Sequence, residues 1–410
     1  MTAGAPRKIF VLEVRPERHC LGGVFEPRVL PLPLDHPRPG DNHIVMLPIG
    51  KDLSVLDDTI PDAAWARARI GLGKVVFDAS EEGHAHTPER THKLHQFLAR
   101  LGIEPTQAVY ITQDRGYGAA YGAHCGASGV GSPMKVVVFD NWIREISRQN
   151  EGRADEEFQA RLDAYRRRPR QRRWRFLSLN RTLRATKVLF LLRLMEDGLW
   201  DQGAISVGGL ERLVDLKGRS QAKIERRLFA LEPFADLNTR LQPLWPQLRA
   251  IGEIGFHTER SDPKFGPLLD DPLVEYGQSW FSVVTESEMR DRASRITEKP
   301  LKPLMNFHPL IVLGNPGALG LLRAYGFQTH AGLFDESYDE EPDPRRRFEM
   351  VYQQVRRLCA MDEAELDRLE RTLDETLVFN ARHALVELPR MFRARLDPAL
   401  VADILSPAAP

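Results

Sequence analysis

Residues 74 to 112 read KVVFDASEEGHAHTPERTHKLHQFLARLGIEPTQAVYIT, and their hydrophobic period changes twice. The runs Lys74–Asp78 and Ala108–Thr112 are continuous apolar segments that end in a polar residue, which is typical of buried parallel strands. Between them, Pro88–Leu101 has apolar residues at helical spacing, and Gly102 supplies a C-cap. A strand, a helix and a strand in this order predict an α/β domain.

The same rhythm continues on both sides of this stretch. Further strands are predicted at Lys8–Val14, His43–Pro48 and Lys135–Asp140 in the first half, and at Arg175–Asn180, Ala204–Gly208, Trp280–Val284 and Pro309–Gly314 in the second. Helices are predicted at Leu183–Leu194 and Gly317–Gly326, and residues 343 to 394 have an almost wholly helical pattern.

The length of 410 residues exceeds what one hydrophobic core usually organises, so two domains are expected. We predict an N-terminal Rossmann-like domain at 1–150 and a basic linker at 151–174. A second Rossmann-like domain follows at 175–342, and a helical segment at 343–410 packs back on the domains. The linker contains the run Arg166–Arg173, which we interpret as solvated. A polyanion-binding patch is the alternative.

The composition excludes several classes of protein. There are 57 Lys and Arg residues and 57 Asp and Glu residues, so no net charge draws the chain to nucleic acid or to an anionic membrane. The cysteines Cys20, Cys125 and Cys359 have no disulfide or zinc spacing. The apolar segment Val188–Met195 is far too short for a membrane span. A cytoplasmic protein, with at most peripheral membrane association, is expected.

Two segments of the second half carry candidate anion-binding residues. Thr297 is placed to cap a helix that begins with Glu298 and Lys299, and a helix N-terminus with a lysine suits a phosphate. The strand that ends at Asn180 is followed by Arg181, Arg184 and Lys187, whose three-residue spacing lets them share one helix face. The alternatives are an ordinary capped helix and three solvated basic residues.

These segments carry a family resemblance. The runs Trp280–Glu286, Ile296–Lys299, Pro309–Gly314 and Leu322–Phe327 resemble the donor domain of α-1,3-fucosyltransferase-like and related GT-B enzymes. The continuation through Phe334–Asp339 is similar to a group of uncharacterised bacterial and phage glycosyltransferase-like proteins. The resemblance covers roughly residues 174 to 350.

The resemblance implies two Rossmann-like domains facing across a cleft, with a nucleotide-sugar donor in the second and the acceptor in the first. It also implies that Glu298 contacts the nucleoside ribose and that Lys299 and Arg181 contact the diphosphate. The sequence has no Asp-x-Asp pair to hold a divalent ion. We therefore expect no metal and no cofactor, with cations neutralising the leaving group.

The acceptor side is predicted around the end of the strand at residues 74–78. Glu82 is the first candidate for the catalytic base, because a carboxylate pair such as Glu81 and Glu82 can raise the pKa of one member toward working pH, and Asp78 is the second candidate. His84 is a candidate acceptor-binding residue. A solvated turn is the alternative.

The glycine-rich segment 115–131 is interpreted as a flexible acceptor-side loop in which Tyr117 and Tyr121 stack on a sugar, rather than a plain surface loop. Together these features predict a metal-independent glycosyltransferase that moves a hexosyl or deoxyhexosyl group to a saccharide or glycoconjugate acceptor. The alternative is a non-catalytic nucleotide-binding protein, or a nucleic-acid-binding protein that uses Arg166–Arg173.

Overall fold

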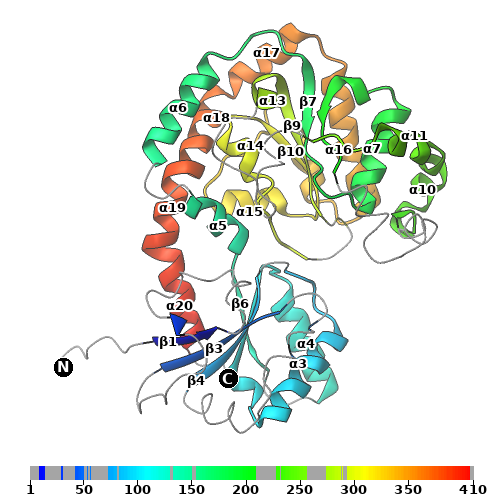
Figure 1. Cartoon of the computed structure of the whole chain (residues 1–410). Helices are drawn as coiled ribbons and strands as arrows, with labels where there is room; N and C mark the ends of the chain where they lie inside the picture. Colours follow the sequence, from blue (N-terminus) through cyan, green and yellow to red (C-terminus); the bar gives the residue numbers. More distant parts are fainter. Residues whose placement is uncertain are drawn as a thin grey trace. The chain divides into compact units, whose positions relative to one another are not determined.

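The computed structural model describes residues 9–13, 29–30, 42–49, 53, 56, 73–80, 83–129, 133–149, 154–208, 228–230, 232–255, 274–287, 289 and 293–406. The chain forms two compact units. The first unit contains Met1–Glu145, Arg292–Arg295 and Arg390–Pro410, and the second contains Ile146–Asp291 and Ile296–Pro389. Each unit is built around its own sheet (Figure 1), so the two are described separately.

The first unit has a six-stranded sheet with the order β2-β1-β3-β4-β5-β6, in which every neighbouring pair is parallel. The strands are β1 (Ile9–Glu13), β2 (Val29–Leu30), β3 (Asn42–Pro48), β4 (Gly73–Ala79), β5 (Ala108–Thr112) and β6 (Lys135–Val138). The helices α3 (Pro88–Leu101) and α4 (Tyr117–Ser128) connect β4 to β5 and β5 to β6. Such crossovers are required between parallel strands.

Helix α3 begins and ends at the residues that the sequence predicts. The Thr87 hydroxyl accepts a hydrogen bond from the backbone N–H of Arg90 at 3.2 Å, and Pro88 occupies the first turn. Gly102 ends the helix in the left-handed conformation with a φ of 65°. The apolar face of α3, including Leu94 and Leu98, is buried in the core of the unit.

The segment predicted as a flexible acceptor-side loop is helix α4, so that prediction is wrong. Tyr117, Tyr121 and Cys125 recur every four residues and form one buried face, and the Tyr117 ring stacks on Tyr110 at 4.3 Å. The opposite face carries glycines such as Gly122, beside which there is open space. Because Tyr117 and Tyr121 are at most 1% exposed, their rings cannot stack on an acceptor sugar.

The second unit has a four-stranded parallel sheet with the order β10-β9-β7-β8. The strands are β7 (Trp174–Ser178), β8 (Gly203–Ile205), β9 (Ser279–Thr285) and β10 (Leu310–Leu313). Around it lie α6 (Ala154–Arg166), α7 (Ala185–Glu196), α10 (Ala235–Leu241), α11 (Trp245–Ile251), α13 (Val274–Gly277), α14 (Leu301–Met305), α15 (Ala318–Ala324), α16 (Pro344–Cys359), α17 (Glu363–Thr372) and α18 (Asp374–Arg382). Strands β9 and β10 are buried along their whole length, as in a sheet covered on both faces.

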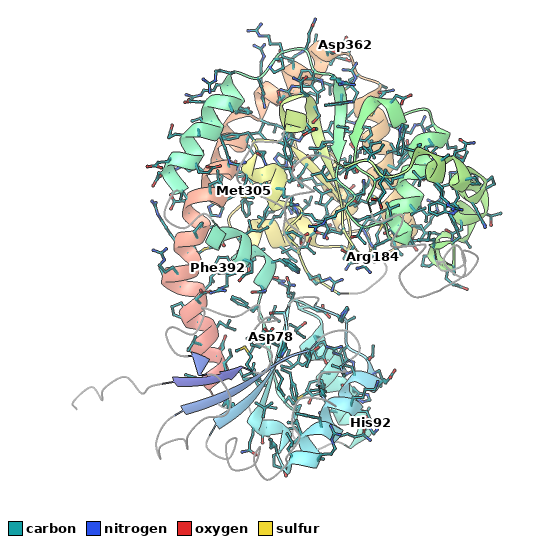
Figure 2. The ribbon with its side chains drawn as sticks, viewed as in Figure 1. Asp78, His92, Arg184, Met305, Asp362 and Phe392 are labelled. Carbon is teal, nitrogen blue, oxygen red and sulfur yellow. The ribbon has the colours of Figure 1, made fainter. Side chains whose placement is uncertain are left out.

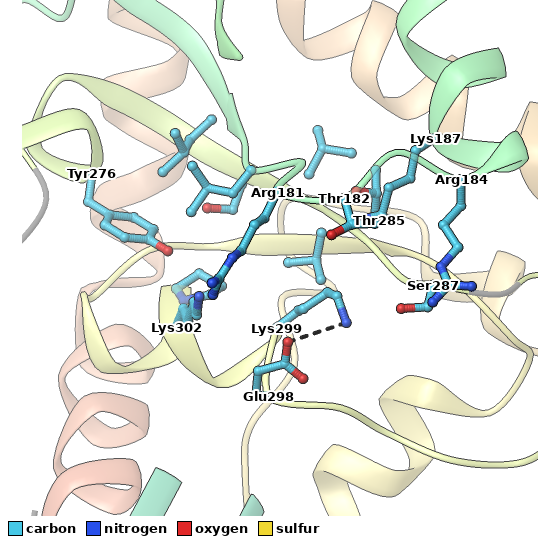
Figure 3. Close-up of a pocket in the computed structure, with 16 residues that line it drawn as sticks. Arg181, Thr182, Arg184, Lys187, Tyr276, Thr285, Ser287, Glu298, Lys299 and Lys302 are labelled. Atoms are coloured by element: carbon cyan, nitrogen blue, oxygen red, sulfur yellow. Dashed lines mark ion pairs between the residues drawn. The ribbon is translucent and has the colours of Figure 1, made fainter. Parts of the chain in front are cut away.

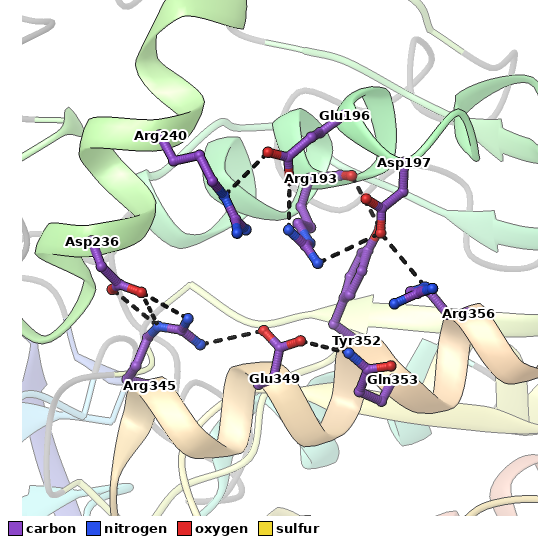
Figure 4. Close-up of polar contacts among 10 residues, drawn as sticks. All are labelled: Arg193, Glu196, Asp197, Asp236, Arg240, Arg345, Glu349, Tyr352, Gln353 and Arg356. Atoms are coloured by element: carbon purple, nitrogen blue, oxygen red, sulfur yellow. Dashed lines mark hydrogen bonds and ion pairs between the residues drawn. The ribbon is translucent and has the colours of Figure 1, made fainter.

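Polar contacts join the C-terminal end of α7 to α10 and α16 (Figure 4). Arg193 donates to Glu196 at 2.6 Å and lies over the ring of Tyr352, 4.9 Å from its centre. Arg240 of α10 pairs with Glu196 at 3.1 Å, and the Tyr352 hydroxyl donates to Asp197 at 2.9 Å. These contacts hold the C-terminal end of α7 against α10 and α16.

Two arginines of the predicted basic linker are not solvated. Arg172 is 7% exposed, donates to the carboxylate of Glu370 at 2.8 Å, and stacks on Trp280 at 4.1 Å. Arg168 pairs with the same carboxylate at 2.8 Å and lies over the Tyr165 ring. The solvated interpretation is therefore wrong for these two residues, because both pair with the carboxylate of Glu370 on α17 inside the second unit.

The C-terminal residues return to the first unit. After α18 the chain continues through His383–Glu387, α19 (Leu388–Met391) and Phe392–Leu396 to α20 (Asp397–Leu405). Arg144 donates to Asp397 at 2.8 Å, at the start of α20. The prediction of an α/β protein with two Rossmann-like parallel sheets and a helical C-terminal segment is confirmed. Within the described residues, no helix has both the length and the apolar character needed to span a bilayer.

Candidate functional site

The second unit has a cavity at the carboxyl end of its central strands. The chain passes from β7 to β8 on one side and then to β9 on the other side of β7, so the strand order reverses between β7 and β9. Ligands of open parallel sheets bind at such a reversal, because the connecting segments diverge there and leave a crevice. Residues that follow β7 and the end of β9 line a cavity of about 310 Å³ at this point.

Cationic side chains dominate the wall of this cavity (Figure 3). The charged residues that line it are Arg181, Arg184, Lys187, Lys299, Lys302 and Glu298. Five cations face one carboxylate among the described lining residues, and this excess suits a ligand with several negative charges. The structure thus brings together five of the seven predicted donor-binding residues, all except Asn180 and Thr297.

The N-terminus of α7 lies at the same cavity. This helix has twelve residues, and no side chain caps its first turn at Arg184. Both Arg184 and Lys187 line the cavity, so the unbonded N–H groups and partial positive charge of the helix end are beside it. The sequence predicts this role for a helix that begins at Glu298. That prediction is wrong, because α14 begins only at Leu301 and is five residues long.

Glu286, which directly follows β9, holds the turn that carries Lys299. The Thr297 hydroxyl lies 2.7 and 2.8 Å from the two carboxylate oxygens of Glu286, and Lys299 Nζ lies 3.3 Å from the nearer one. The Thr297 hydroxyl also accepts from the backbone N–H of Lys299 at 3.3 Å. Thr297 therefore positions Lys299 and does not itself line the cavity.

Gly314 has no side chain, which leaves space for the side chain of Glu286 beside it. A Cβ atom at Gly314 would lie 2.9 Å from Cγ of Glu286, which is closer than carbon atoms pack. Sequence reasoning did not select Glu286 as a site residue. The sequence carried one signal that could have identified Glu286, because this residue is a carboxylate at the end of a buried strand.

Electrostatics distinguish two lysines of the cavity, the half-buried Lys299 and the buried Lys187. Although burial lowers it, the pKa of Lys299 is raised overall by Glu286 and Glu298, so Lys299 is a permanent cation. Burial, followed by repulsion from Lys299, lowers the pKa of Lys187 to about 7. Burial raises the pKa of Glu298, but the nearby Lys299 and Lys302 lower it by more. The pKa therefore lies below its ordinary value, and this carboxylate stays ionised.

Asn180 joins the strand ends instead of lining the cavity. Its side chain is fully buried, donates to the Ser178 carbonyl at 3.2 Å, and accepts from the Thr285 hydroxyl at 2.7 Å. The backbone carbonyl oxygen of Asn180 accepts from the N–H of Gly208 at 2.9 Å, and a Cβ at Gly208 would lie 2.4 Å from the backbone carbonyl oxygen of Arg181. These contacts fix the backbone from which the Arg181 side chain enters the cavity.

Ser282 supplies a neutral polar group to the cavity wall. His308 Nε2 lies 2.9 Å from the Ser279 carbonyl oxygen, which can only accept, so Nε2 carries the hydrogen. The other ring nitrogen, Nδ1, then accepts from the Ser282 hydroxyl at 2.8 Å. Burial holds the pKa of His308 well below its ordinary value, so the imidazole stays neutral. Ser282 is left with lone pairs for a donor group of a ligand.

The helix that follows β10 offers no comparable anion site. The backbone N–H groups of Leu319 and Gly320, in the first turn of α15, donate to the Asp339 carboxylate at 3.1 and 3.2 Å. Asp339 is only 6% exposed and therefore occupies the position that an external anion would take.

Asp78, the second candidate for the base, lies at the end of β4. Asp78 is 4% exposed, and its carboxylate accepts from the backbone N–H and the hydroxyl of Ser80 at 3.0 and 2.5 Å. It thereby stabilises the turn after the strand. His84 is half-buried, and Glu82 lies outside the described residues.

Comparisons with known proteins place the chain in no family. No protein-family model matches the sequence, and no curated protein matches it. Among solved structures, the chain is similar to α,α-trehalose 6-phosphate synthase from Burkholderia multivorans, with 11% identity and a TM-score of 0.38 over 89% of this chain and 71% of that chain. A likeness at this level carries no argument, so the fold class rests on the two parallel sheets themselves.

Proposed function

We propose that this protein is a metal-independent GT-B glycosyltransferase that binds a nucleotide-sugar donor in the cavity of its second unit. The observation that carries the proposal is the convergence of five basic side chains and the α7 N-terminus where the strand order reverses. A nucleotide sugar presents a diphosphate, and the charge on this leaving group grows as the bond to the sugar breaks. Fixed cations around the diphosphate therefore stabilise the transition state more than the ground state.

Individual roles follow from the geometry. Arg181 and Lys299 approach the cavity from the β7–α7 segment and from the turn before α14, so both can contact one diphosphate. Arg181 offers a bidentate fork, and Lys299 a point charge held by Glu286. Glu298 is an ionised carboxylate that only accepts hydrogen bonds, which suits the hydroxyls of a ribose.

Charge neutralisation by the protein is the reason to propose metal independence. A divalent cation in a nucleotide site is usually held by one or more carboxylates in addition to the phosphates. The described cavity wall has one carboxylate, Glu298, and it is already paired with Lys299 at 3.4 Å.

The reaction that we propose is attack by an acceptor hydroxyl on the anomeric carbon of the donor sugar. The new bond forms to the acceptor oxygen, the bond to the diphosphate oxygen breaks, and the hydroxyl proton passes to a base. Glu82 is our proposed base. The acceptor is a saccharide or glycoconjugate, and the transferred group is a hexose or a deoxyhexose.

A thermal-shift panel tests the donor site. Uridine, guanosine and thymidine diphosphates and their sugar conjugates are added with and without EDTA to the wild type and to Arg181→Ala, Lys299→Ala and Arg167→Ala. One nucleotide should stabilise the wild type regardless of EDTA, since ligand binding to the native state raises the melting temperature. Stabilisation should be lost in the two cavity variants and kept in Arg167→Ala, whose side chain is exposed and outside the cavity. No stabilisation of the wild type, or stabilisation that survives both cavity variants, would overturn the proposal.

Turnover distinguishes the enzyme from a non-catalytic nucleotide-binding protein. Glu82→Gln should keep nucleotide affinity while reducing transfer or donor hydrolysis by about a hundredfold, because general-base catalysis contributes that much. Full activity in this variant would assign the base to another residue. Nucleotide binding without any turnover in the wild type would favour the binding protein.

A further inference from the structure

The buried Lys187 and the half-buried Lys299 line one cavity, and within the described residues only Lys299 has an acidic partner. Lys299 Nζ lies 3.3 Å from Glu286 and 3.4 Å from Glu298. Lys187 is 4% exposed and points from the first turn of α7 into the cavity (Figure 3). Within the described chain, no hydrogen bond or ion pair reaches its amino group.

The surroundings of Lys187 disfavour an unpaired ammonium at this position. Arg184 lies on its own segment, Lys299 lies on the turn before α14, Lys302 lies in α14, and Arg181 lies on the turn after β7. The acidic groups near it, Glu286 and Glu298, are already paired with Lys299. An unpaired ammonium that is removed from water and placed among other cations is costly, and loss of its proton relieves the cost.

The direction of the pKa shift of Lys187 agrees with this geometry. Burial, with a further contribution from Lys299, lowers the pKa of Lys187 to about 7. An anion beside the amino group would act in the opposite direction, because an opposite charge stabilises the protonated form. The first turn of α7, which has no capping side chain, offers N–H groups to the same anion.

We infer that Lys187 takes up a proton when a phosphate group enters the cavity, so that donor binding is coupled to proton uptake. The inference rests on the proposed donor site. In the free protein above neutral pH, Lys187 is neutral and must be protonated before it pairs with the phosphate. Affinity therefore decreases as the pH rises above neutral and is nearly constant below it. Release of the diphosphate returns the proton.

Isothermal titration calorimetry tests this coupling. UDP-glucose and GDP-mannose serve as probes, because their phosphate diesters remain fully ionised near neutral pH and take up no proton themselves. Sodium sulfate serves as an anion without a nucleoside. Each titration is made at about pH 7.5 in PIPES and in Tris, whose ionisation enthalpies differ, and the slope of the binding heat against that enthalpy counts the protons. The wild type should take up about 0.7 proton per site.

Two variants separate the role of Lys187 from a general loss of charge. Lys187→Met should bind with a proton uptake near zero and with an affinity that no longer depends on pH. Lys302→Met removes another lysine of the same wall and should bind more weakly while keeping the proton uptake. Thermal denaturation of each variant checks that it is folded.

The outcomes distinguish this inference from the proposed function. Binding of a nucleotide sugar without proton uptake in the wild type, or with uptake that persists in Lys187→Met, overturns the inference and leaves the donor site intact. Sulfate binding with proton uptake, but no binding of either nucleotide sugar, supports the inference and contradicts the proposed donor. If none of the three probes binds, both are overturned.

Discussion

The carboxyl ends of the parallel strands carry charged residues in both units, but the two units use them differently. In the first unit, Asp114 follows β5 and accepts from the N–H groups of Gly116 and Ser294 at 3.0 and 2.9 Å. Asp140 follows β6 and accepts from Arg115 at 3.0 Å. In the second unit, Arg181 and Lys187 follow β7 and line a cavity. Figure 2 labels one such residue of each unit, Asp78 and Arg184.

The difference shows how one edge of a sheet can serve either stability or binding. A strand-end carboxylate that accepts from nearby backbone groups completes the fold, and its removal leaves donors without partners. A strand-end cation that faces a cavity gains its best partner only when a ligand arrives. Substitutions in the first unit should therefore change the free energy of unfolding, and those in the second should change affinity.

Lys299→Met should have the largest effect, because Lys299 both pairs with carboxylates of the fold and lines the cavity. The substitution leaves the buried carboxylate of Glu286 and the half-buried carboxylate of Glu298 without their cation, and it removes one proposed phosphate contact. We expect nucleotide-sugar affinity to fall about a hundredfold and the free energy of unfolding to fall by about 2 kcal/mol. Calorimetry measures the affinity, and urea denaturation measures the free energy of unfolding.

Lys93→Met is the matched control for this variant. Lys93 pairs with Glu89 at 3.1 Å on α3, but both side chains are at least half exposed. Exposed ion pairs contribute little to stability, so the free energy of unfolding and the nucleotide-sugar affinity should both stay nearly unchanged. Unchanged affinity in Lys299→Met would remove Lys299 from the donor site.

Asp114→Ala should reduce stability and leave nucleotide-sugar affinity nearly unchanged. Asp114 is 3% exposed, and the substitution leaves two backbone N–H groups without their acceptor. The free energy of unfolding should fall by about 2 kcal/mol, while nucleotide-sugar affinity should stay within about twofold of the wild type. A large loss of affinity with little loss of stability would contradict the comparison between the two units.

Gly314→Ala should have an intermediate effect on affinity. The added methyl group would lie 2.9 Å from Cγ of Glu286 and would displace the carboxylate that holds Lys299. We expect affinity to fall about tenfold, in line with the loss of one well-placed charged contact. Gly320→Ala is the control, because a Cβ there meets nothing within 4 Å. Equal affinities in the two variants would show that Glu286 is not the positioning residue.

A pH dependence of the first unit is the smallest effect that we expect. Burial, followed by repulsion from His124, lowers the pKa of His86 and of His95. Their folded-state values then lie below the unfolded value of about 6.5, so the unfolded chain binds more protons in acid. Stability should be constant above that pH and should decrease as the pH falls below it.

Hydrogen exchange of α3 and α4, corrected for the intrinsic rate at each pH, measures this change. Exchange should accelerate in the acidic range in the wild type and less so in His95→Gln. Protection that is independent of pH would mean that the histidines titrate equally in the folded and unfolded states.

Sequence patterns predicted most elements because their causes are local. Thr87 and Gly102 end α3 through hydrogen bonds within a few residues, and the apolar runs of β9 and β10 carry their own signal of burial. Helix α4 was missed because its glycines suggest a loop. The four-residue recurrence of Tyr117, Tyr121 and Cys125 was present in the sequence, but only packing in the first unit made it decisive.

Sequence patterns alone predicted most strands and helices in their order along the chain and indicated Arg181 and Lys299 as anion-binding candidates, since strand ends and basic residues are visible one segment at a time. Only the tertiary structure decided that these two segments line one cavity, that α7 and not α14 offers its N-terminus there, and that Lys299 has two carboxylates while Lys187 has none. The physical reason is that burial and charge pairing depend on neighbours in space, and most of those neighbours are distant along the chain.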